Sequence, residues 1–249
     1  LQETMFANVA DAVRGVKDRL DHMVLTALSN DGVVTFNSSN NPDGRRFTID
    51  YQLPDANKKF VNKVWSDANL TTADPFEDMS KVVNDFADKV TFGAMLMSNE
   101  TLLRLAKFTT IKKAIYGTDK MNTPLMLDYM NEQFQRFGLP PITVIRKQND
   151  VLTNGKRSTV NPWNKDRVVF VPTGKLGLVK TAFEDSQIMP EENVSYSNYD
   201  RGNIVVAQWR TGESKNELAA EMTQASSRAV PVLTAIDGIV SLNIASTGS

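Results

Sequence analysis

The sequence contains no cysteine and only one histidine, His22. Without cysteine there are no disulfide bonds, no thiolate nucleophile and no cysteine-ligated metal. A single histidine, with no second one nearby, also supplies too few ligands for a metal site. Packing of a hydrophobic core is therefore the expected source of stability, and 249 residues are enough for one large or two modest domains.

Long apolar runs and an excess of one charge are also lacking. No run approaches the roughly 20 apolar residues that cross a bilayer, and no signal-peptide pattern is present. Lysine and arginine number 28 against 29 aspartates and glutamates, a net charge of −1. This balance gives no electrostatic case for a dedicated nucleic-acid or membrane binder. The composition indicates a globular protein, and the cytoplasm is the expected compartment.

Motifs for catalysis are sparse. There is no G-x-S-x-G elbow. The stretch Gly174 to Gly177 has the glycines of a phosphate loop but lacks the Gly-Lys-Ser/Thr ending and a clear helix after it. The basic pairs Lys112-Lys113 and Lys156-Arg157 are typical of ordinary solvated surface.

Three groups of titratable residues have a helical spacing. Asp18 and His22 are four residues apart, so a carboxylate could orient the imidazole, but a solvated or interface histidine is the favoured interpretation. Two carboxylate pairs, Asp74 with Asp78 and Asp128 with Glu132, could serve acid–base chemistry or magnesium. The first pair suits a helix N-terminus and the second a wet helix face, because nothing indicates the burial that perturbs an acid. We predict no catalytic, cofactor-binding or metal-binding residue.

The most prominent pattern is a long amphipathic helix over residues 1–29. Its apolar residues recur at steps that alternate between three and four, which places them on one stripe: Phe6, Val9, Val13, Val16, Leu20, Met23 and Ala27. Such a helix spans roughly 40 Å at 1.5 Å per residue. Rigid spars of this kind are typical of structural proteins.

A hairpin and a connector are predicted next. Residues 30–32 form a turn signal, 33–36 a short strand, 37–44 a turn-rich stretch, and Phe47 to Tyr51 a half-buried strand. A polar connector covers 53–73, and Trp65 is expected to pin it to the rest of the protein.

The middle of the chain alternates helix and strand, which favours a sheet with helices packed against it. Asp74 and Pro75 begin one helix, and a strand over 94–97 runs into a helix capped by Ser98. Another helix is predicted from Thr123 to Gly138, followed by a strand over 143–146.

The last hundred residues are predicted to be strand-rich. An exposed hairpin or loop covers 148–165, with reversals at Asn149-Asp150 and Asn154-Gly155. Strands follow at 168–171, 204–209 and 239–244, with a polar span between 172 and 200. Residues 217–230 fit a helix or a long strand equally well, and periodicity alone leaves both open.

The order of these elements resembles the major capsid proteins of tailed bacteriophages, in particular the group similar to the lambda head protein, which has the HK97-type fold. The resemblance rests on the helix led by Ala73 to Asp78, the strand-to-helix step Met95 to Leu103, and the apolar strand Asp166 to Gly177 with its Pro-x-Gly-x-x-Gly ending. These are patterns of residue type and order, and they extend over nearly the whole chain.

The resemblance implies an α+β fold with two domains. A peripheral domain, 1–74 with 200–231, would hold the long spine helix and an antiparallel sheet. An axial domain, 75–199 with 232–249, would hold a mixed sheet flanked by helices, with the 148–165 loop near a symmetry axis. It also favours a strand for 217–230. The family's N-terminal arm and extended hairpin loop precede the spine helix, so we expect that the sequence is N-terminally truncated and, by itself, a monomer or weak oligomer.

The implied function is a structural, non-enzymatic phage or prophage head subunit that self-assembles into an icosahedral shell enclosing DNA. Expected partners are other copies in pentamers and hexamers, scaffold, portal and decoration proteins, and packaged DNA through non-specific contacts. The expected location is the virion, preceded by the host cytoplasm. Alternatives are an encapsulin-like shell, a tail or connector ring protein, and a cytoplasmic α/β enzyme with an unrecognised site.

Overall fold

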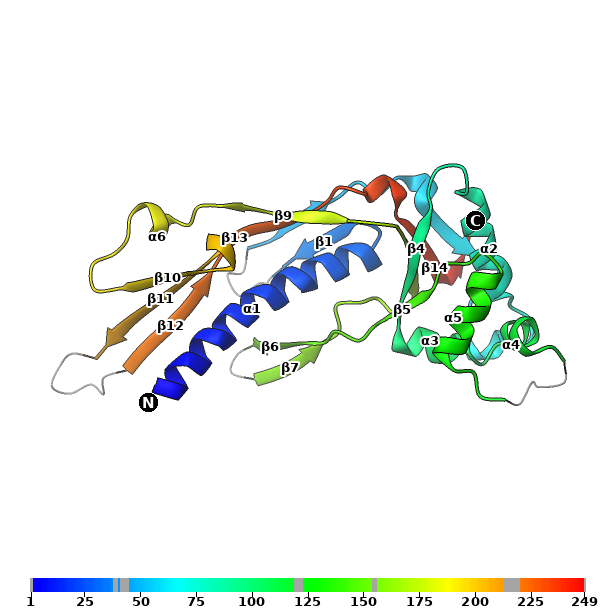
Figure 1. The fold of residues 1–249 in the computed structure, drawn as a ribbon, viewed down its shortest axis with the longest axis horizontal. Coiled ribbons are helices and arrows are strands. Elements are labelled where there is room, and N and C mark those ends of the chain that lie inside the picture. Colours follow the sequence, from blue (N-terminus) through cyan, green and yellow to red (C-terminus); the bar gives the residue numbers. More distant parts are fainter. Residues whose placement is uncertain are drawn as a thin grey trace. The chain divides into compact units, whose positions relative to one another are not determined.

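The computed structural model describes residues 2–37, 40, 45–118, 123–153, 156–212 and 220–248. The chain divides into two compact units. The first unit comprises Leu1–Val24 and Leu178–Val232, and the second comprises Leu25–Gly177 and Leu233–Ser249. Each unit contains helices and sheets, so the fold is of the mixed α and β class (Figure 1).

The predicted long helix is confirmed as α1, Gln2–Ser29. Val9, Met23 and Ala27 of its apolar stripe are buried, and the stripe residues between them, Val13, Val16 and Leu20, are half-buried. The helix ends where the Ser29 hydroxyl donates to the Leu25 carbonyl, 2.8 Å away. The predicted turn follows, with Asp31 and Gly32 in the left-handed region.

After this turn the predicted hairpin is present in the second unit. Strand β1, Val33–Phe36, pairs antiparallel with β2, Phe47–Asp50. The rings of Phe36 and Phe47 stack with centroids 4.4 Å apart. Part of the turn-rich stretch that joins the strands, 38–39 and 41–44, lies outside the described residues.

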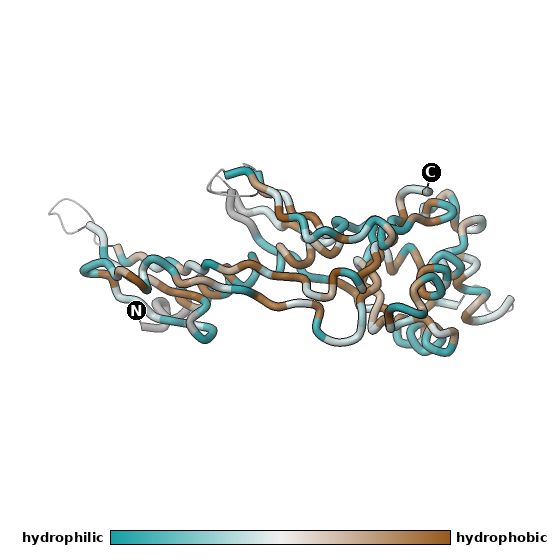
Figure 2. Tube along the Cα trace, turned by 90° about the horizontal axis from the view of Figure 1, so that it is seen from above, coloured by the Kyte–Doolittle hydropathy of each residue, from teal (hydrophilic) through white to brown (hydrophobic). Residues whose placement is uncertain are grey.

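The second unit is built on a mixed five-stranded sheet in the order β3-β14-β8-β4-β5. Its strands are β3 (Lys58–Val61), β4 (Phe92–Ser98), β5 (Ile142–Ile145), β8 (Arg167–Pro172) and β14 (Val240–Thr247). The pairs β4–β5 and β3–β14 are parallel, and β8 is antiparallel to both of its neighbours. In Figure 2, hydrophobic and hydrophilic stretches alternate along the part of the chain that holds the C-terminus.

Four helices pack beside this sheet (Figure 1): α2 (Pro75–Asp85), α3 (Asn99–Leu105), α4 (Thr109–Tyr116) and α5 (Leu127–Arg136). The predicted caps are confirmed, because Asp74 accepts from the backbone N–H of Glu77 and Ser98 from that of Thr101. Helix α5 begins at Leu127 rather than at Thr123, since Met126 before it is extended. Helix α4 was absent from the sequence prediction.

The predicted exposed hairpin is also present. Strand β6, Asn149–Thr153, pairs antiparallel with β7, Lys156–Val160. The predicted reversal at Asn149-Asp150 is wrong, because both residues pair within β6. The second predicted reversal, Asn154-Gly155, lies outside the described residues.

The first unit contains a three-stranded antiparallel sheet, β10-β11-β12, and a two-stranded pair, β13 with β9. The strands are β9 (Gly177–Ala182), β10 (Ser195–Tyr199), β11 (Ile204–Thr211), β12 (Ala220–Ser226) and β13 (Arg228–Leu233), and the short helix α6 covers Asp185–Ile188. The described part of 217–230 is therefore strand, but divided at Ser227. The span between 172 and 200, read only as polar, holds β9, α6 and β10.

Short 3-10 turns complete the description: Asp55–Asn57, Asp67–Asn69, Asp200–Gly202 and Ile236–Gly238.

Candidate functional site

Asp78 is the sequence-predicted acid that the structure buries. Its side chain accepts hydrogen bonds from the indole Nε1 of Trp65, 2.8 Å away, and from the backbone N–H of Asn62, 3.0 Å away. Burial raises the pKa of Asp78, and these two hydrogen bonds act in the opposite direction. Its place in the first turn of α2 agrees with the prediction of a helix N-terminus, but its burial was not predicted, since the residue is only 4% exposed. Its partner Asp74 caps α2, so the two carboxylates do not form a shared site.

Trp65, which meets Asp78, anchors the connector as predicted. Its ring is buried against Phe108, with centroids 6.2 Å apart. Its backbone N–H donates to the Ile244 carbonyl at 2.9 Å, and its own carbonyl accepts from Arg104 at 3.1 Å. The Trp65–Asp78 pair therefore binds the connector to α2, α3 and β14, which is a structural task.

The second carboxylate pair lies on the exposed side of α5. Asp128 is in the first turn of α5, and Glu132 accepts from Arg136 at 2.6 Å. This exposed ion pair contributes little to stability.

His22 is half-buried on α1. Burial lowers its pKa, and the nearby Arg19 lowers it further. Among the residues that the structure describes, no three histidine, aspartate or glutamate side chains are grouped so that they could hold a metal ion.

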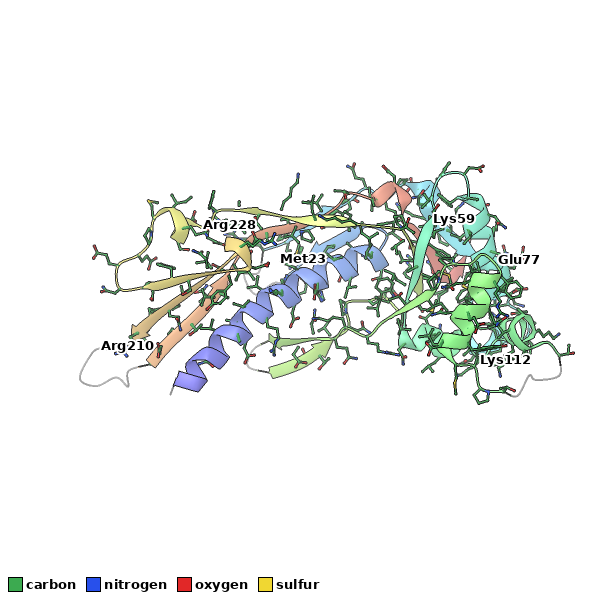
Figure 3. The ribbon with its side chains drawn as sticks, viewed as in Figure 1. Met23, Lys59, Glu77, Lys112, Arg210 and Arg228 are labelled. Atoms are coloured by element: carbon green, nitrogen blue, oxygen red, sulfur yellow. The ribbon has the colours of Figure 1, made fainter. Side chains whose placement is uncertain are left out.

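The glycine stretch 174–177 is a turn rather than a phosphate loop. Gly174 is in the left-handed region, and Gly177 begins strand β9 instead of a helix. Lys112 and Lys113 lie on α4, with Lys113 exposed (Figure 3 labels Lys112). The side chains of Lys156 and Arg157 lie outside the described residues.

The most unusual surface is in the first unit, on residues 178–189, which we call the β9–α6 segment. Five large apolar side chains are exposed there: Leu178, Val179, Phe183, Ile188 and Met189. Phe183 is 74% exposed and Met189 is 76% exposed. The sequence interpretation missed this surface, although its spaced apolar residues in a polar span were a visible signal.

Polar contacts hold the backbone of this segment in place. Arg228 of β13 donates to the Phe183 carbonyl at 3.4 Å and pairs with Asp185 (Figure 3). Gln187 closes a capping box with Glu184 and donates to Asn198 of β10 at 3.1 Å. A shallow groove of about 420 Å³ lies beside it, lined by residues that include Tyr196 and Trp209. The segment is thus anchored while its apolar side chains face outward, as in a surface that contacts another protein.

In the described part of the chain, no helix combines the length and the apolar character needed to cross a membrane. No curated protein sequence matches the chain.

The fold is shared with a capsid protein. One similar solved structure is a crystal structure assigned as the capsid protein of a prophage of E. coli CFT073, with a TM-score of 0.63 and 16% sequence identity. The match covers 96% of this chain and 66% of that chain. At this identity the likeness establishes the fold class.

The family described as phage major capsid protein E matches residues 1–244, and the chain belongs to this family. It is therefore a structural capsid subunit of the virion and not an enzyme. The resemblance to phage major capsid proteins that the sequence indicated is confirmed.

Proposed function

We propose that this chain is the shell-forming part of a phage or prophage head subunit, which self-assembles through pentamers and hexamers into an icosahedral shell around DNA. The observation that carries the proposal is the β9–α6 segment, whose exposed apolar side chains stand on a fixed backbone. When a neighbouring subunit covers an apolar surface of this kind, the free energy of association becomes more favourable by about 25 cal/mol per Å² buried.

The HK97-type arrangement belongs to the same proposal. In it, residues 1–74 with 200–231 form the peripheral domain, and 75–199 with 232–249 form the axial domain. The β6–β7 hairpin of the axial domain would face a symmetry axis. The long α1 and the antiparallel sheet β10-β11-β12 support the peripheral domain, while β3 pairs with β14 in the sheet of the second unit.

The partners follow from the shell. We infer scaffold, portal and decoration proteins as protein partners, and non-specific contacts with packaged DNA. The net charge of −1 is compatible with many copies side by side, since little repulsion accumulates between them. Before assembly the subunit would be in the host cytoplasm.

Electron microscopy of the full-length gene product tests the shell directly. We expect uniform hollow particles. Only small species from the full-length product, with its scaffold present, would contradict the proposal. Particles filled with protein instead of DNA would indicate the encapsulin-like alternative.

A surface variant tests the β9–α6 segment. Replacing Phe183 and Met189 by serine should reduce particle yield, because the contact loses apolar area without a change in the core. Met126 is 73% exposed in the second unit, so Met126→Ser is a control of matched exposure. Equal particle yield from both variants would show that the segment is not part of the contact.

A further inference from the structure

Strand β5 is an edge of the five-stranded sheet, since among the described strands it pairs with β4 alone. The Pro141 carbonyl accepts from the backbone N–H of Met95 at 2.8 Å, so its backbone faces β4. Backbone groups alternate along a strand, and those of Ile142 and Val144 therefore face away from the sheet. These outward groups form a template to which another strand can be added.

The protein fills the first of these positions itself. The side-chain amide of Asn131, on α5, donates to the Ile142 carbonyl at 3.1 Å and accepts from the Ile142 N–H at 2.8 Å. Asn131 thus takes the place of a neighbouring strand for one residue. Among the described residues, nothing bonds to the outward N–H and C=O of Val144, the next position.

The open edge leads to a polar groove. This groove, about 650 Å³ in volume, is lined at the strand's end by Ile145 and Arg146 and also by Gln148, Trp163 and Lys165. Arg146 is exposed and makes no ion pair within the described part of the chain, whereas Lys165 already pairs with Glu100 at 3.3 Å. Glu100 also lines the groove, but it pairs with Arg104 and Lys165, so Arg146 is the charged lining residue that has no ion pair within the described part of the chain. This cation suits a ligand that carries a carboxylate.

We propose that an extended acidic segment of a second copy adds to the open edge of β5 as a further strand. This inference rests on the proposed function, because it needs copies that assemble. The chain offers one suitable segment, residues 183–200, which holds five acidic residues and no lysine or arginine. Its strand β10 is itself an edge of the three-stranded sheet, and Glu191 and Glu192 precede it. Backbone hydrogen bonds would give the affinity, and Arg146 opposite an acid would fix the register.

Cross-linking tests the pairing, and residues 1–249 contain no cysteine that would compete with the two introduced ones. Thr143 on β5 and Ser197 on β10 are both exposed. Full-length Thr143→Cys and Ser197→Cys proteins would be co-assembled and treated with a short thiol-to-thiol reagent. We expect a cross-linked dimer that contains one chain of each variant. Glu77→Cys, on the exposed side of α2, replaces Thr143→Cys in the control and should give no such dimer (Figure 3).

A charge exchange gives a second readout. Arg146→Glu should weaken association between copies about tenfold, and Glu191→Lys with Glu192→Lys in the same chain should restore it. Particles that form without the Thr143–Ser197 cross-link, or with equal cross-linking in the control, overturn the strand pairing alone. Unchanged association of the Arg146→Glu protein does the same. Absence of particles from the wild-type full-length product overturns the proposed function instead.

Discussion

At the scale of single residues, two carboxylates join parts of the second unit that are far apart in the sequence. Asp31, in the turn after α1, accepts from Arg167 and from Ser241, each at 2.7 Å. Asp78 does the same for the connector through Trp65. Their roles are structural. Replacing either one would therefore lower the free energy of unfolding.

Replacing Asp78 by alanine should lower the free energy of unfolding by about 2 kcal/mol. The reason is that the buried indole N–H of Trp65 and the backbone N–H of Asn62 would each lose their acceptor. Urea unfolding followed by tryptophan fluorescence measures the change. Asp88→Ala, at an exposed position, is the control and should change stability little. An equal effect of both substitutions would refute the assigned role.

His22 provides a direct test of the electrostatics of α1, because it is the only histidine. Its NMR titration should give a pKa below the usual value of about 6.5, since burial and Arg19 disfavour the charged ring. The fold then favours the neutral ring. The stabilisation that His22 contributes is fully present above the unfolded-state pKa of the residue. It is lost as the pH falls through the folded-state pKa. A titration at or above the usual value would contradict this prediction.

At the scale of elements, sequence patterns predicted best where a local signal and the tertiary environment agree. The caps Asp74 and Ser98 and the stripe of α1 are such cases. Residues 217–230 were undecided because alanine and glutamate favour helix locally, whereas pairing of β12 with β11 decides for strand. Strands β9 and β10 were missed because they are exposed, so no alternating buried face marks them.

The same reasoning applies to the candidate surface. Phe183 and Met189 are ordinary residues in the sequence, and only their exposure makes them candidates. Their spacing within a polar span was visible in the sequence, but whether such side chains are buried or exposed depends on tertiary packing, which periodicity does not report.

The contribution of the N-cap of α3 to stability can be tested by comparing substitutions of two serines. Ser98 caps α3 and is buried, whereas Ser66 begins a short 3-10 turn without a side-chain capping bond. Ser98→Ala should cost about 1–2 kcal/mol of unfolding free energy, because the Thr101 N–H loses its acceptor. Ser66→Ala should cost little. Chemical denaturation of both proteins measures the difference, and similar losses would show that the cap is unimportant.

At the scale of the whole molecule, the two units differ in their cores. The core cluster of buried apolar side chains, which includes Trp65, Met79, Phe108 and Phe170, belongs entirely to the second unit. The first unit relies on thin sheets, with Ile204, Val205 and Val206 of β11 as a main buried group. A unit with less buried apolar area has a lower free energy of local unfolding.

We therefore expect the first unit to unfold at a lower urea concentration than the second. The chain has three tryptophans, of which Trp209 is in the first unit and Trp65 is in the second. Variants that keep only one of these two as the fluorescent reporter should give different midpoints, with that of Trp209 lower. Coincident midpoints would instead mean that the chain unfolds as one cooperative body.

The place of β14 has a consequence for synthesis of the protein. This strand, residues 240–247, lies between β3 and β8 inside the sheet, so it separates segments made much earlier. On the ribosome the sheet stays incomplete until Thr247 has emerged, and β8 lacks one neighbour until then. A prematurely terminated chain would be left with an open sheet and an exposed core, open to proteolysis. Emergence of β14 from the ribosome is thus required before the sheet can close and the subunit can join others.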